Sequence, residues 1–198
     1  MKSNLKRKSV IMLVYEGKNK TEHNYFKHFN NRENNFRIVP VDSPETDIKG
    51  MADYAIKYAK NYDIKSAYGD KIFCIFDLDI NKQKLEEYEQ IRYNKKYKDI
   101  NFIVSNPCFE IWFLFHFEEH PPRLPSSEKV KKHLCKYVKN YEENIDVYEK
   151  YNLKSLLSKA LTYANNKKDS MKGKPLLDKN PYTQIPEVIY EFDKMNNI

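Results

Sequence analysis

Short apolar runs alternate with amphipathic segments over the first half of the chain. Continuous apolar runs are typical of strands buried on both faces of a sheet, whereas apolar residues three or four positions apart indicate a helix. The strand pattern occurs at residues 10–15, 36–41, 72–76 and 101–104. Helical spacing occurs between these runs, at residues 21–29, 48–62 and 82–95. Strands that alternate with helices predict an α/β fold with a mostly parallel sheet.

The character of the chain changes after residue 104. Asn106 and Pro107 fit the start of a helix, because Asn caps free N–H groups and Pro is accommodated at the first helical position. The pattern then predicts further helices at residues 109–117, 127–141, 153–164 and 186–195. We therefore expect an α/β core over residues 1–118 and a helical C-terminal extension over residues 119–198 that packs on it.

The composition adds a basic charge to this picture. The chain has 35 Lys and Arg against 28 Asp and Glu, a formal net charge of +7. Such a charge favours a polyanionic partner such as DNA or RNA, although many lysine-rich proteins bind no nucleic acid. The three cysteines are widely spaced, so neither a zinc site nor a disulfide framework is expected, and a cytoplasmic location fits. The apolar run at residues 10–15 is too short to span a membrane.

Two carboxylates directly follow the apolar run at residues 72–76. Asp77 and Asp79 would lie at the carboxyl end of a strand, the edge where sites gather in open α/β sheets. Because they are two positions apart, an extended chain would direct both side chains to the same face. Neighbouring carboxylates repel each other unless a cation separates them, and Mg²⁺ or Mn²⁺ prefers oxygen ligands. We expect a divalent-metal site here. The alternative is a polar strand end at which Asp79 caps the next helix.

Glu16 ends another apolar run in the same way, immediately before Gly17. Two strands would then bring acids to one edge of the sheet, so Glu16 is a further candidate metal ligand. Glu22 has a different context. It lies three residues after Asn19, and this spacing resembles a capping box, so a structural role at the start of a helix is the expected one.

Glu110 and His116 interrupt the most apolar helical segment. An unpaired carboxylate is costly to bury, so Glu110 is expected either to benefit from the helix dipole or to face the acidic site as an accessory group. His116 is six residues further along the same helix and over about 100° round from Glu110, so the two are not expected to act as a pair. We expect His116 to be a core histidine, with an accessory role as the alternative.

Three motifs, in this order, resemble the RloB family of bacterial proteins. They are Val-Tyr-Glu-Gly at residues 14–17 with Glu22, Phe-Asp-Leu-Asp at 76–79, and Ser-Asn-Pro-Cys-Phe-Glu-Ile-Trp at 105–112 with His116. The later Asn-Pro-Tyr-Thr at residues 180–183 is similar to that family's C-terminal Asn-Pro-x-Thr element. The similarity covers most of the chain, and the Ser-Asn-Pro-Cys-Phe-Glu stretch is its specific part.

The resemblance implies a Toprim-like fold, shared with topoisomerases, primases and the overcoming-lysogenization-defect nucleases. It implies that Glu16 is a general acid or base and that Asp77 and Asp79 hold Mg²⁺. RloB-like proteins occur among restriction-modification and phage-defence genes, often beside an ATPase, which implies a partner ATPase. Asn81 stands where many Toprim proteins have a third acid. This departure disfavours a topoisomerase and leaves the number of metal ions open.

Taken together, these features predict a Mg²⁺-dependent nuclease with Glu16, Asp77 and Asp79 as catalytic residues. Basic residues outside the acidic site are expected to hold the nucleic acid, namely Lys18, Lys20, Lys167, Lys168, Lys172 and Lys174. The alternative is a non-catalytic partner or nucleic-acid-binding subunit in which the acids are vestigial. Either kind of protein is compatible with an oligomer. A nucleotidyl or phosphoryl transferase ranks last, because the chain has no GxxxxGK[ST] loop and only four glycines.

Overall fold

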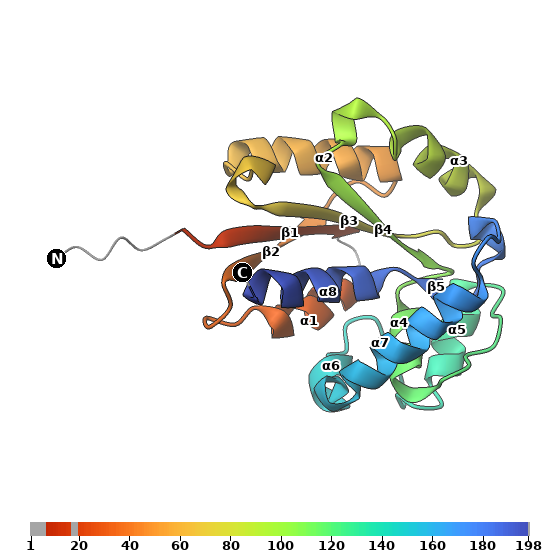
Figure 1. The fold of residues 1–198 in the computed structure, drawn as a ribbon. Coiled ribbons are helices and arrows are strands. Elements are labelled where there is room, and N and C mark those ends of the chain that lie inside the picture. Colours follow the sequence, from red (N-terminus) through yellow and green to blue (C-terminus); the bar gives the residue numbers. More distant parts are fainter. Residues whose placement is uncertain (1–6, 17–19, 198) are drawn as a thin grey trace.

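The computed structural model describes residues 7–16 and 20–197, and within them five strands form one sheet (Figure 1). Their spatial order is β2 (Phe36–Ser43), β1 (Ser9–Glu16), β3 (Lys71–Asp77), β4 (Ile100–Asn106) and β5 (Tyr182–Thr183). The first four strands are parallel, and β5 pairs antiparallel with the end of β4. The expected α/β class with a mostly parallel sheet is confirmed.

Helices cover both faces of this sheet (Figure 1). One face carries α2 (Ile48–Asn61) and α3 (Lys82–Ile91). The other carries α1 (Thr21–Phe26), α4 (Glu110–Phe117) and α8 (Ile185–Asn196), with α5 (Ser127–Leu134), α6 (Val147–Lys150) and α7 (Leu153–Ser170) further out. Short 3-10 helices lie at Lys27–Phe29, Ser66–Tyr68, Lys95–Tyr97 and Leu176–Asp178. No helix among the described residues is long and apolar enough to cross a bilayer.

The pattern of β1 explains why the strand is apolar throughout. Successive side chains of a strand point to opposite faces of the sheet. Val10, Met12 and Val14 therefore pack in the core beneath α2, while Ile11 and Leu13 pack in the core on the α8 side. Because helices cover both faces, every position of the run is buried, and the strand has no solvent side on which a polar residue would be favoured.

The helix α4 is buried nearly all round, as its mostly apolar sequence predicts. Trp112, Leu114 and Phe115 are each 0% exposed. Their cover comes from α5 and α7, which follow α4 in the chain and pack against it. The chain after α4 also supplies β5 to the sheet and α8 to one of its faces.

The expectation that Asn106 caps a helix was wrong. Asn106 is the last residue of β4, and the N-cap of α4 is Phe109. The Asn106 side chain instead ties loops together. Its Oδ1 accepts the Ile80 N–H at 3.1 Å, and its Nδ2 donates to the Lys179 carbonyl at 2.8 Å. Because this amide satisfies loop groups across the sheet edge, it is unavailable for capping.

A candidate acidic metal site

Three acidic side chains line one small pocket at the carboxyl edge of the sheet. Glu16 and Asp77 are the last residues of β1 and β3, and Glu22 is the second residue of α1. The pocket has a cavity volume of about 50 Å³ and is also lined by Lys84 of α3. Since a cavity of about 10 to 15 Å³ already holds one water molecule, this space can hold a small hydrated ion.

Glu110 reaches the same cluster from the start of α4. Single ligand atoms of Asp77, Glu110 and Cys108 all lie within 4.8 Å of one another. The Glu110 and Cys108 side chains are buried, at 3% and 0% exposed. Carboxylate oxygens are the ligands that Mg²⁺ and Mn²⁺ prefer, whereas the Cys108 sulfur is a softer group that Mg²⁺ does not take. The carboxylates of this cluster therefore fit a hard divalent cation.

The electrostatics of the cluster point the same way. Burial raises the pKa of Asp77 well above its ordinary value, and the charges of Glu22 and Glu110 raise it further, while Lys84 opposes them. Burial likewise raises the pKa of Glu22 from 4.5 to about 8, with added repulsion from Glu110 and Glu16. Asp77 and Glu22 are thus costly to ionise beside the neighbouring acids, and a bound cation would remove that cost.

Two lysines partly neutralise the acids, and a tyrosine donates a hydrogen bond to one of them. Lys84 Nζ donates to the Asp77 carbonyl at 3.0 Å and lies 2.6 Å from Asp79 Oδ2. Lys131 of α5 lies 3.9 Å from Glu110 and forms an ion pair with Glu143. The Tyr141 hydroxyl donates to Glu110 at 2.8 Å. The C-terminal extension therefore contributes side chains to the acidic site directly.

Asp79 lies at the rim of this cluster, whereas the sequence pattern placed it beside Asp77. The backbone leaves the extended conformation after Asp77, and Asp79 has a φ of 54°. Its side chain is 40% exposed and accepts a hydrogen bond from Ser127 at 2.6 Å in addition to the Lys84 ion pair. The expectation that Asp77 and Asp79 point the same way was therefore wrong, because it assumed an extended chain through both residues.

Glu22 lies in the first turn of α1 and also faces the acidic cluster. The N-cap of α1 is Lys20, and this cap has no side-chain hydrogen bond. Asn19, the other half of the expected capping box, lies outside the described residues. Glu22 lines the acidic pocket. A capping box and a ligand near a helix start use the same residue types, so the sequence pattern alone does not separate the two roles.

His116 is a core residue, as expected. It is 1% exposed, and its Nδ1 is 2.9 Å from the Trp112 carbonyl. Its Nε2 is buried and has no hydrogen-bond partner among the described residues, as is also true of the Tyr25 hydroxyl. Burial lowers the pKa of His116 to about 4, so the ring is neutral at physiological pH. It lies in the aromatic core around Tyr25.

The lysines expected to bind nucleic acid have different positions. Lys18 lies outside the described residues, and Lys20 is exposed at the start of α1. The others lie at or just after the end of α7. Lys168 is paired with Glu187 at 2.7 Å, Lys167 is half-buried, and Lys172 and Lys174 are exposed. Lys174 lines a hollow beside β5 together with Arg92 and Lys179.

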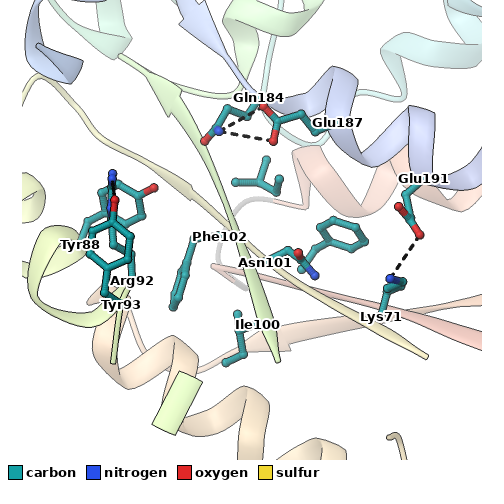
Figure 2. A pocket seen from close by; sticks show the side chains of 12 residues that line it. Lys71, Tyr88, Arg92, Tyr93, Ile100, Asn101, Phe102, Gln184, Glu187 and Glu191 are labelled. Carbon is teal, nitrogen blue, oxygen red and sulfur yellow. Dashed lines mark hydrogen bonds and ion pairs between the residues drawn. The ribbon is translucent and has the colours of Figure 1, made fainter. Parts of the chain in front are cut away.

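A larger hollow of about 610 Å³ lies along the outer edge of β4 (Figure 2). Among the described residues, β5 pairs only with Ser105 and Asn106, so the earlier part of that edge is open. The glutamates of this hollow already have partners. Glu191 is 3.6 Å from Lys71, and Glu187 accepts a hydrogen bond from Gln184 at 3.2 Å (Figure 2). Paired carboxylates create no demand for a cation, so the acidic pocket is the better candidate.

A second group with metal-ligand geometry contains His28, Asp146 and Glu149. Asp146 in this group is already satisfied, because Lys27 lies 2.7 Å away and His28 Nε2 lies 2.9 Å away. It also accepts the Glu149 N–H at the start of α6. This group is therefore explained by its internal hydrogen bonds and ion pairs.

Sequence reasoning missed the side chains that surround the acids. Cys108 stands between Pro107 and Phe109 in the motif that carried the family resemblance, so its position was visible although its role was not. Lys84 and Lys131 had no distinguishing signal, because they are two of many lysines on amphipathic helices. Only the packing of α3 and α5 beside the strand ends identifies them.

Comparison with known proteins gives one match. A protein-family model described as RloB-like protein matches residues 11–192, nearly the whole chain. No curated protein and no solved structure matches.

Proposed function

This chain belongs to the RloB-like family, and we propose that it is a divalent-metal-dependent nuclease that hydrolyses phosphodiester bonds of DNA or RNA. The observation that carries the proposal is the convergence of acids from separate elements. Asp77 of β3, Glu110 of α4 and Glu22 of α1 repel one another electrostatically. Such a cluster is stabilised by a cation, and carboxylate-bound Mg²⁺ is a common centre for phosphoryl chemistry.

Asp77 and Glu110 would hold the cation, with Glu22 as the third carboxylate. When bound, the cation would polarise the scissile phosphate and stabilise the attacking or leaving oxygen. Glu16, at the end of β1 beside the pocket, would take the proton from the attacking water. Lys84 would be free to contact the phosphate once a cation neutralises the acids, while Asp79 would orient Lys84.

The expected biological setting comes from the family resemblance. We propose that the protein acts in bacterial antiviral defence, in the cytoplasm, together with an ATPase partner. The second candidate is a non-catalytic subunit of such a complex. Its support is that Lys84 and Lys131 already neutralise part of the acidic cluster without a cation. In that case the lysines would be permanent partners of the acids.

Calorimetric titration with Mn²⁺, followed by incubation with DNA and with RNA, separates the two candidates. The nuclease proposal expects Mn²⁺ binding and metal-dependent cleavage by the wild type. Asp77→Asn should weaken Mn²⁺ binding at least about 100-fold, since loss of even a supporting residue costs 10- to 100-fold. Asp63→Asn is the control, because Asp63 is 66% exposed and outside the pocket. Cleavage that survives in Asp77→Asn would refute the assignment.

A further inference from the structure

Three tyrosines follow one another along one face of α2. Tyr54, Tyr58 and Tyr62 are spaced four residues apart, which brings their side chains onto the same side of the helix. The ring centroids of Tyr54 and Tyr58 are 6.3 Å apart. Those of Tyr58 and Tyr62 are 4.3 Å apart, with an interplanar angle of 21°. Tyr58 and Tyr62 are thus stacked, Tyr54 is tilted against Tyr58, and we call the three residues the tyrosine ladder.

Core packing accounts for only part of the ladder. Tyr54 and Tyr58 are partly buried and pack against the core beneath α2, beside the buried Met51, Ala52 and Ala55. Tyr62 is 61% exposed, so much of its ring surface is open to solvent. The exposed ring at the end of the ladder is therefore accessible to a flat partner such as a base.

Basic side chains lie beside the ladder. Arg37 of β2 is exposed, and its charge acts on the Tyr58 hydroxyl. Lys57 and Lys60 are exposed on α2 itself. The carboxylate of Asp53 on the same helix is already paired with Lys96 at 2.5 Å. Aromatic rings that stack on bases, flanked by cations that contact phosphates, are the combination by which proteins bind single-stranded nucleic acids.

The ladder also leads to the acidic pocket. Ile48 and Met51, in the first turn of α2, line that pocket. With a helix rise of about 1.5 Å per residue, Tyr54 is about 5 Å and Tyr62 about 17 Å along the axis from Met51. We propose that the tyrosine ladder binds single-stranded DNA or RNA by base stacking and directs it toward the acidic pocket. This inference rests on the proposed nuclease function, because it names the substrate class of that same site.

The test measures binding in EDTA, where no metal-dependent cleavage occurs. The probes are a fluorescein-labelled 20-nucleotide RNA, the DNA of the same sequence, and the blunt duplex of each, followed by fluorescence anisotropy. The wild type should prefer the single strands. Tyr62→Ala should weaken their binding about 10-fold, as expected for the loss of one stacked base. Arg37→Ala should reduce the slope of log affinity against log salt by about 0.7, the value for one phosphate contact on a single strand.

Two further variants make the test specific. Tyr62→Trp should keep the affinity, and its added fluorescence should be quenched by the single strands, because the natural Trp112 is 0% exposed and gives a constant background. Tyr93→Ala is the matched control, since Tyr93 is 75% exposed and lines the β4 hollow, away from the ladder. Equal affinities of Tyr62→Ala and wild type, or a preference for duplexes, would overturn the ladder proposal. Either result would leave the nuclease proposal standing, because that proposal is tested by metal-dependent cleavage. Conversely, an absence of cleavage together with single-strand binding by the ladder would reject only the nuclease proposal.

Discussion

Replacing Glu22 by glutamine should stabilise the metal-free protein, by an amount that grows as the pH rises from about 4.5 to about 8. Burial and neighbouring carboxylates raise the pKa of Glu22 from 4.5 to about 8. Between these values the folded state binds more protons than the unfolded state, so the stability of the wild type falls as the pH rises through this window. Glutamine has nearly the same shape and cannot ionise, so it removes this loss.

The size of the effect follows from the two pKa values. A tenfold change in proton affinity corresponds to about 1.4 kcal/mol, so the interval from 4.5 to about 8 sets an upper bound of about 5 kcal/mol. The Glu22 side chain is half-buried, and solvent screening lowers the expected gain to about 2 kcal/mol at pH 8. For a chain of this size that gain raises Tm by about 4 to 8 °C. At pH 5 the variant and the wild type should nearly coincide.

Thermal unfolding followed by circular dichroism at pH 5 and pH 8 measures this difference. Glu33→Gln is the control, because Glu33 is exposed and lies outside the acidic pocket. Saturating Mn²⁺ should raise the Tm of the wild type at pH 8 more than that of Glu22→Gln, because the cation relieves the same repulsion. A variant that is less stable than the wild type at pH 8 without metal would show that the acids do not repel one another in the way described.

Three other changes test neighbouring features. Asp70→Ala should lower the free energy of unfolding by about 3 kcal/mol, because the buried Asp70 carboxylate accepts two hydrogen bonds from Arg7 and one from the Val10 N–H. Urea denaturation measures this loss, and an unchanged midpoint would contradict it. Burial lowers the pKa of His116 from 6.5 to about 4, so between these pH values the unfolded chain binds a proton that the folded protein does not, and wild-type stability falls as the pH falls. His116→Leu should make the free energy of unfolding less dependent on pH in this range. An equal pH dependence in both proteins would contradict this prediction. Lys131→Met should lower Tm at pH 8 and Mn²⁺ should restore it, because Glu110 and Glu143 lose their cation, whereas Lys129→Met at an exposed position should change little.

Local sequence patterns were enough to predict the layered α/β architecture. The run at residues 10–15 became β1 because a strand covered on both faces needs apolar side chains at every position. Because β1 and β3 are parallel, the acids that end these runs lie at the same carboxyl edge of the sheet. Glu16 and Asp77 could therefore be predicted as pocket residues. The helix expected at residues 127–141 ended earlier, at Leu134, where no local signal marks a stop.

The composition of the acidic cluster, in contrast, depended on tertiary structure. Asp79 was expected beside Asp77, but the chain turns at Asp79 and Ile80, which both have positive φ, and the Asp79 side chain contacts Lys84 and Ser127. Glu22 and Glu110 lie 88 residues apart in sequence and become neighbours only because α1 and α4 pack on the same face of the sheet. Periodicity reports which side of its own element a residue occupies. It carries no information about which distant charge will stand opposite, and that pairing determines the electrostatics of the site.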